Sequence, residues 1–175
     1  MIALCRTCSN SKTDCQSMSP VPLTLEVVST EPKAFIIENF LSDFEADSIV
    51  AFAKPRIAES TVGNRDAGGV RASTTRTSRN TWIPRHSSPI FESLFLRAAH
   101  LLKIDEKLLT TANNAEDLQV VNYQNGQKYD PHHDWGVSGY PESRYLTLLL
   151  YLSDPPHDRA GGETAFPKGK LDDPI

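Results

Sequence analysis

The sequence lacks a hydrophobic run long enough to cross a membrane. Its longest apolar stretch, Leu146–Leu152, is far shorter than the roughly 20 residues of a membrane-spanning helix. The first residues also lack the uninterrupted apolar segment of a secretory signal. We therefore expect no membrane segment in this chain and, from this N-terminus alone, a cytosolic location.

Positive charge in excess is also missing. The chain has 18 Lys and Arg against 22 Asp and Glu, a net charge of −4, and no basic block interleaved with aromatic residues. A nucleic-acid-binding surface needs a basic face, so the composition argues against a nucleic-acid partner. With 39% hydrophobic residues in 175, the sequence is that of an ordinary globular protein of about one domain.

Cysteine is scarce, and all three cysteines lie near the N-terminus. Cys5 and Cys8 have a CxxC spacing that suits zinc or redox chemistry, and Cys15 follows in the same polar segment. A zinc ribbon needs a second pair of ligands, and none follows. We therefore expect residues 1–22, rich in Ser, Thr and Pro, to form a flexible leader, and residues 23–175 to form the domain.

Two helices are predicted. Ser42 and Glu45 have the spacing of a capping box, and Pro55 is expected to end the helix that begins there. Its expected apolar face consists of Phe44, Ile49, Val50 and Phe52. Ser88 followed by Pro89 predicts the start of a second helix, which runs to about Lys103.

Strands account for most of the rest. Short strands are expected over residues 23–40, and a long polar loop over 59–80 leads to a strand at 81–83. From residue 118 onward we expect only strands and turns: 118–124, then 144–153 buried on both faces, and a shorter strand at 161–167. Helices followed by strands indicate an α+β fold with the helices packed outside a β-sandwich or barrel.

The clearest chemical signal is His132 and Asp134, which follow an apolar, β-rich run. Side chains at i and i+2 of an extended segment point the same way, about 6.6 Å apart, whereas His133 between them points to the opposite face. An imidazole and a carboxylate so placed are two of the three ligands in the two-histidine, one-carboxylate set that holds non-haem iron(II). No histidine follows His157.

Two other interpretations of this pair remain. A His and an Asp in a turn after Pro131 are ordinarily surface residues. An adjacent His-Asp pair also occurs in helical metal phosphohydrolases, but the residue before a proline is biased against helix, which argues against that class.

Four motifs in the same order resemble the catalytic domain of prolyl 4-hydroxylases: RTSRNTWIPR at 76–85, YQNGQKYDPHHDW at 123–135, RYLTLLLYLSD at 144–154 and GGETAFP at 161–167. The resemblance covers about residues 35–170. It implies a double-stranded β-helix, or jelly-roll, core with the N-terminal helices outside. It also implies iron(II), 2-oxoglutarate and L-ascorbate as cofactors, a proline-containing peptide or protein as substrate, and the endoplasmic reticulum as the compartment.

The resemblance carries roles to individual positions. His132 and Asp134 match metal ligands. The 2-oxoglutarate pocket is matched by Tyr123, Thr164 and Thr147. The groove that binds the proline peptide is matched by Arg76, Ser78, Glu116, Tyr129 and Arg144.

The sequence also departs from this family. The resemblance implies a distal histidine ligand and a lysine that pairs with 2-oxoglutarate, and both are expected beyond residue 175. Lys168 and Lys170 follow the GGET motif and do not match that lysine. We therefore expect an incomplete dioxygenase domain that lacks its last strands and is inactive by itself. One alternative is a non-catalytic module that binds proline peptides or has a regulatory role. Another is a cupin-like domain that binds a sugar or a metal, but the RTS and GGET motifs argue against it.

Overall fold

The structure, a computed structural model, describes residues 2–7, 22–62, 71–72, 75–109, 114–134, 144–154 and 161–169, with only the backbone at 2–7, 61–62 and 71–72. The chain divides into two compact units. Unit 1 consists of Met1–Ile49 and Pro131–Ile175, and unit 2 of Val50–Asp130. The domain boundary predicted at residue 22 stays a prediction.

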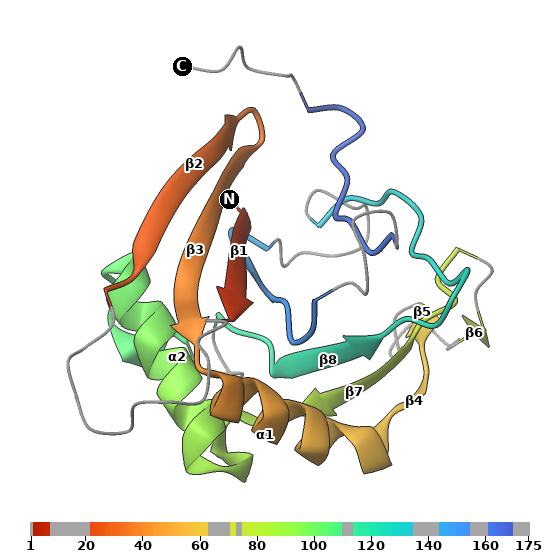
Figure 1. Cartoon of the computed structure of the whole chain (residues 1–175), viewed down its shortest axis with the longest axis horizontal. Helices are drawn as coiled ribbons and strands as arrows, with labels where there is room; N and C mark the ends of the chain where they lie inside the picture. Colours follow the sequence, from red (N-terminus) through yellow and green to blue (C-terminus); the bar gives the residue numbers. More distant parts are fainter. Residues whose placement is uncertain are drawn as a thin grey trace. The chain divides into compact units, whose positions relative to one another are not determined.

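Unit 1 contains a four-stranded sheet in the order β2-β3-β1-β9. Strands β2 (Thr24–Thr30) and β3 (Lys33–Leu41) form an antiparallel hairpin, drawn in orange in Figure 1. Strand β1 (Ile2–Thr7) runs parallel to β3 on one side and to β9 (Thr147–Leu150) on the other. The sheet is therefore mixed, with its parallel pairs made by the N-terminal segment.

The flexible leader predicted for residues 1–22 is wrong for Ile2–Thr7. These residues, including Cys5, form β1 and pair with two strands that are distant in the sequence. Cys8 and Cys15 lie outside the described residues. Nothing local in the sequence predicts this strand, because its partners lie about 30 and 145 residues further along the chain.

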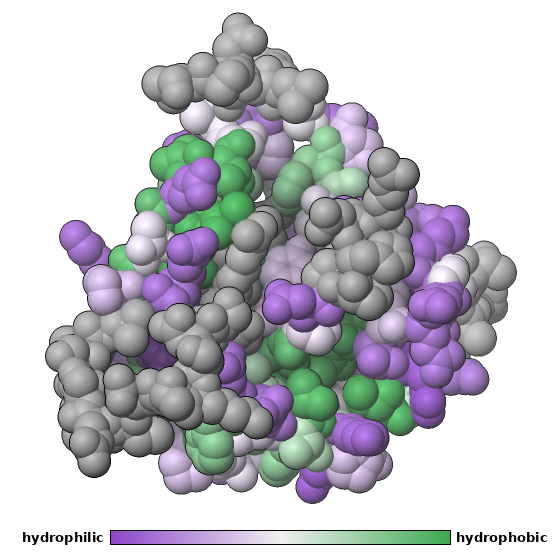
Figure 2. Space-filling model, in the orientation of Figure 1, coloured by the Kyte–Doolittle hydropathy of each residue, from purple (hydrophilic) through white to green (hydrophobic). Residues whose placement is uncertain are grey.

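The two strands of the hairpin differ in burial. β3 contributes core residues to unit 1, listed from the N-terminal end as Ala34, Ile37, Phe40 and Leu41. β2 lies at the sheet edge, where Leu25 is 52% and Val27 57% exposed. Figure 2 shows this hydrophobic surface where the hairpin lies in Figure 1. An apolar edge strand is a surface prone to pairing with another chain.

Helix α1 (Asp43–Ala53) begins at the predicted capping box. The Ser42 backbone N–H donates to Glu45 Oε2 at 2.9 Å, and the Glu45 N–H donates to Ser42 Oγ at 3.3 Å. The predicted apolar face is partly wrong: Phe44 is 73% and Val50 42% exposed. The buried residues are Ala46, Ile49 and Ala53, a narrower stripe at the same helical period.

Replacing Ser42 with alanine tests this cap. The substitution removes Ser42 Oγ, which accepts the Glu45 N–H and donates to Glu45 Oε2, whereas the backbone N–H of residue 42 stays, so the free energy of unfolding is expected to fall by about 1 kcal/mol. Urea denaturation followed by circular dichroism measures the loss. Ser48→Ala, which removes only a hydroxyl bonded to the Phe44 carbonyl within the helix, is the matched control and is expected to change stability by less than about 0.5 kcal/mol. Equal losses in the two variants would contradict the capping box.

Unit 2 contains a three-stranded antiparallel sheet in the order β4-β7-β8. β7 (Arg79–Ile83) is its middle strand, between β4 (Ala58–Glu59) and β8 (Leu118–Asn122). The predicted loop over 59–80 is partly ordered, since β5 (Thr61–Val62) pairs with β6 (Arg71–Ala72) inside it. The other short helices of this unit are the 3-10 turns η1 (Lys54–Arg56), η3 (Arg85–Ser87) and η4 (Glu106–Leu108).

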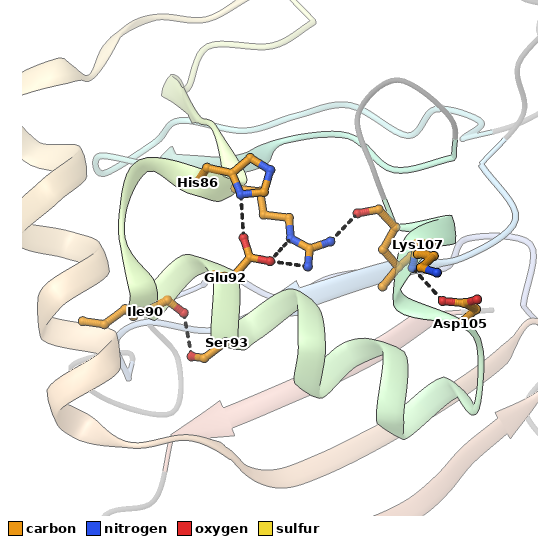
Figure 3. Close-up of polar contacts among 8 residues, drawn as sticks. His86, Ile90, Glu92, Ser93, Asp105 and Lys107 are labelled. Carbon is orange, nitrogen blue, oxygen red and sulfur yellow. Dashed lines mark hydrogen bonds and ion pairs between the residues drawn. The ribbon is translucent and has the colours of Figure 1, made fainter.

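Helix α2 (Pro89–Leu102) confirms the second helix prediction. Ser88 Oγ accepts the Ile90 N–H at 3.3 Å, and Lys103 ends the helix in the left-handed conformation. Figure 3 shows its first turn, where Ser93 donates to the Ile90 carbonyl. The buried residues of α2 are Phe91, Leu94, Ala98 and Ala99.

Two strand predictions need correction. Residues 161–166 are irregular, so the strand predicted at 161–167 is wrong. β9 is only half-buried along its length, not buried on both faces. Helices and strands together make a mixed α+β chain. Within the part of the chain that the structure describes, no helix has the length and hydropathy needed to traverse a bilayer.

Candidate active site

His132 and Asp134 converge in unit 1, although no strand is assigned to the residues that carry them. His132 Nε2 lies 3.4 Å from Asp134 Oδ1, with the side chains 42% and 29% exposed. His133 is exposed as well. The imidazole and the carboxylate that lie two residues apart therefore come together at a partly exposed position.

Thr147, the first residue of β9, and Arg144, three residues before it, hold the Asp134 carboxylate. Thr147 Oγ1 donates to Oδ2 at 2.9 Å, and Arg144 Nη1 donates to Oδ1 at 3.1 Å. The Arg144 backbone N–H also reaches the Asp134 carbonyl at 3.4 Å. The resemblance placed Thr147 at the 2-oxoglutarate pocket and Arg144 in the peptide groove; here both contact the candidate metal ligand, and their predicted roles stay predictions.

The donor chemistry of this pair suits a divalent ion. An imidazole nitrogen and a carboxylate oxygen bind such ions at about 2.0–2.2 Å, so one ion can reach two atoms that lie 3.4 Å apart. Among the described residues, no three His, Cys, Asp or Glu side chains are grouped so that they could hold a metal ion. His132 and Asp134 would thus occupy two coordination positions of a divalent ion.

Thr164, the second residue predicted for the 2-oxoglutarate pocket, also belongs to unit 1. Its Oγ1 lies 2.8 Å from the Tyr151 hydroxyl, so the GGET motif contacts the segment just after β9. Gly161 and Gly162 precede it with φ of 81° and 93°, conformations that glycine adopts without strain. Sequence reasoning missed Tyr151, whose only local signal was its place at the end of an apolar strand.

A second group of predicted residues meets in unit 2. Arg76 and Tyr129 form an isolated antiparallel bridge, and the Arg76 guanidinium lies over the Tyr129 ring, 4.9 Å from its centroid. Arg76 Nε donates to Ser78 Oγ at 3.1 Å. Three of the five residues predicted for the peptide groove are therefore in contact.

Beneath Arg76 lies a polar network that sequence reasoning missed. Ser78 is 2% exposed, and its Oγ lies 3.0 Å from Ser60 Oγ, which accepts from Asn80 Nδ2 at 2.7 Å. Ser78, directly before β7, and Asn80, within it, both contact Ser60 Oγ, so their side chains lie on the same side of the sheet. The pairing of β4 with β7 brings Ser60 to them.

The remaining predicted residues also belong to unit 2. Glu116 is exposed in the segment just before β8, and Tyr123, 46% exposed, directly follows that strand. A turn follows Tyr123: Gly126 has a φ of 78° and the Gln127 N–H donates to the Gln124 carbonyl at 2.9 Å.

Comparisons with known proteins show which family the sequence resembles. Residues 118–173 match the model of the 2OG-Fe(II) oxygenase superfamily. Three relatives from Arabidopsis thaliana are probable prolyl 4-hydroxylase 3 (37% identity over 83% of this chain and 49% of that protein), prolyl 4-hydroxylase 2 (38%, 83% and 47%) and probable prolyl 4-hydroxylase 11 (37%, 94% and 58%). The chain spans about half the length of the curated relatives it matches. The matched domain and these relatives together support a prolyl 4-hydroxylase-like 2OG-Fe(II) oxygenase.

Proposed function

We propose that the protein hydroxylates proline in peptides with O2 and 2-oxoglutarate, and that His132 and Asp134 supply two ligands of its iron(II). The observation that carries the proposal is the 3.4 Å approach of His132 Nε2 to Asp134 Oδ1. The relationship to prolyl 4-hydroxylases supports the reaction. We extend the proposal to L-ascorbate as a further cofactor and to a jelly-roll core with the helices outside.

The roles of the other residues follow the same proposal. When bound, iron(II) and 2-oxoglutarate supply the oxidising chemistry, and the protein provides ligands and orientation. Tyr123 and Thr164 are proposed to bind 2-oxoglutarate. Arg76 and Tyr129 are proposed to bind the proline peptide, with the buried Ser78 hydroxyl fixing the direction of the Arg76 side chain.

Metal binding tests the proposal. We expect Mn²⁺, an air-stable stand-in for iron(II), to bind weakly to this chain, since two protein ligands hold an ion less tightly than three. His132→Ala and Asp134→Ala are each expected to abolish the binding, as followed by electron paramagnetic resonance of free Mn²⁺. His133→Ala is the matched control, because it removes an exposed neighbouring imidazole. Binding that survives in His132→Ala, or that is lost equally in His133→Ala, would reject the proposed ligands.

A second candidate function is peptide binding without catalysis. The contact between Arg76 and Tyr129 favours it, because this contact involves no metal ligand and places a cationic donor beside an aromatic ring. Proline-rich peptides dock on aromatic surfaces of this kind.

Peptide affinity separates the two functions. Arg76→Gln is expected to weaken the binding of a fluorescent proline-rich peptide about tenfold, measured by anisotropy, because it removes the charge over Tyr129. Arg79→Gln, at an exposed arginine three residues away, is the matched control and is expected to leave the affinity unchanged. Unaltered affinity in Arg76→Gln would contradict the assigned groove. Peptide binding that survives in Asp134→Ala favours the non-catalytic function.

A further inference from the structure

The two oxygens of Asp134 have different partners. Oδ2 accepts from the Thr147 hydroxyl at 2.9 Å. Oδ1 lies 3.1 Å from Arg144 Nη1 and 3.4 Å from His132 Nε2. The oxygen that faces the imidazole, and that an ion shared with His132 would use, is therefore the oxygen that a guanidinium already contacts.

Thr147 and Arg144 hold the carboxylate from backbones of different rigidity. Thr147 is the first residue of β9, a paired strand, and its branched side chain has few accessible rotamers. Arg144 lies before the strand, on irregular backbone, with 41% of its side chain exposed. The hydrogen bond to Oδ2 is thus made by a residue that the sheet holds in place. The Arg144 side chain, in contrast, is long, flexible and partly exposed to water.

We propose that Arg144 acts as an internal cation that occupies Asp134 Oδ1 until a divalent metal ion replaces it, and that Thr147 is a positioning residue that holds Oδ2 in both states. The inference rests on the metal role proposed above. Two cations cannot share one carboxylate oxygen at contact distance without strong repulsion. Metal binding therefore releases the guanidinium, and the released side chain becomes available to another anion or acceptor.

The two residues then have opposite effects on metal affinity. Arg144→Gln removes the competitor, and an exposed ion pair is weak, so we expect Mn²⁺ to bind about two- to fivefold more tightly. Thr147→Val keeps the branched shape but removes the hydroxyl that orients the carboxylate. Loss of such a supporting contact is expected to weaken binding about 10- to 100-fold.

The experiment is a titration of the full chain with Mn²⁺, comparing wild type with Arg144→Gln, Thr147→Val and Thr147→Ser. Thr147→Ser retains the hydroxyl and is expected to restore most of the affinity lost in the valine variant. Lys168→Gln, which removes the same charge from an exposed residue of unit 1, controls for net charge and is expected to bind as wild type. Raising the salt concentration is expected to narrow the difference between wild type and Arg144→Gln, because salt screens the exposed pair.

The outcomes are distinct. Suppose that wild type binds Mn²⁺ and that His132→Ala abolishes this binding. If Arg144→Gln then shows no gain in Mn²⁺ affinity, or Lys168→Gln shows an equal gain, the displacement of Arg144 by the metal is overturned. Unchanged affinity in Thr147→Val overturns the positioning role. A wild-type chain that binds no Mn²⁺, or binds it without His132, rejects the proposed metal ligands and this inference with them.

Discussion

Truncating Phe91 to alanine is expected to lower the free energy of unfolding by about 3–5 kcal/mol, because it removes a fully buried ring and leaves a cavity. Phe91 is 1% exposed and is the largest of the buried residues of α2. Its ring packs edge-on against Phe52, with centroids 5.0 Å apart and planes at 76°. Such aromatic pairs add about 0.5–1.5 kcal/mol beyond their burial.

The chain offers the same substitution at an exposed site as a control. Phe44, in the first turn of α1, is 73% exposed, so Phe44→Ala is expected to change stability by no more than about 0.5 kcal/mol. Urea denaturation of both variants gives the comparison. Similar losses at the two positions would mean that Phe91 is not buried in solution. A double-mutant cycle with Phe52→Ala measures the ring contact itself.

The two helices also show where prediction from the sequence succeeds and where it fails. The N-terminal ends of both helices were predicted correctly, because capping by Ser42 and Ser88 depends on residues within a few positions along the chain. The buried face of α1 was predicted less well. Phe44 and Ile49 are equally hydrophobic in the sequence, but only the tertiary packing decides that one is exposed and the other buried.

The same division holds for the candidate site. The spacing of His132 and Asp134 was sufficient to predict that their side chains meet. The hydrogen bond from Thr147 to Asp134 was not predictable, because it joins residues 13 positions apart that lie on different backbone segments. The polar network of Ser60 and Asn80 was missed for the same reason, since it depends on how β4 pairs with β7.

The second large effect on stability that we predict concerns a buried charge in unit 2. Arg85 is 8% exposed, and its Nε donates to Glu92 Oε1 at 2.8 Å while Nη2 contacts the same oxygen. Its Nη1 donates to the Leu109 carbonyl at 2.9 Å, and its guanidinium lies 5.4 Å from the Phe95 ring centroid. The other carboxylate oxygen, Glu92 Oε2, lies 2.8 Å from His86 Nδ1 (Figure 3). The guanidinium thus joins η3, α2 and the residue that follows η4.

Replacing Glu92 with glutamine is expected to destabilise the chain strongly at neutral pH. The substitution keeps the shape of the side chain but removes the negative charge that compensates Arg85, and an uncompensated buried charge is among the costliest single changes. Glu106→Gln, at an exposed carboxylate in η4, is the matched control and is expected to have little effect. Thermal denaturation of the two variants at pH 7 makes the comparison.

The pH dependence gives this prediction its sharpest test. Hydrogen bonds from Arg85 hold the pKa of Glu92 below its ordinary value of 4.5, although partial burial acts in the opposite direction. A carboxyl with a lowered pKa in the folded state stabilises the fold above its ordinary pKa, and this contribution disappears as the pH falls through the folded-state pKa. The stability difference between wild type and Glu92→Gln is therefore expected to shrink progressively below about pH 4.5. A difference that stays constant into acid would show that the loss comes from packing and not from the charge of Glu92.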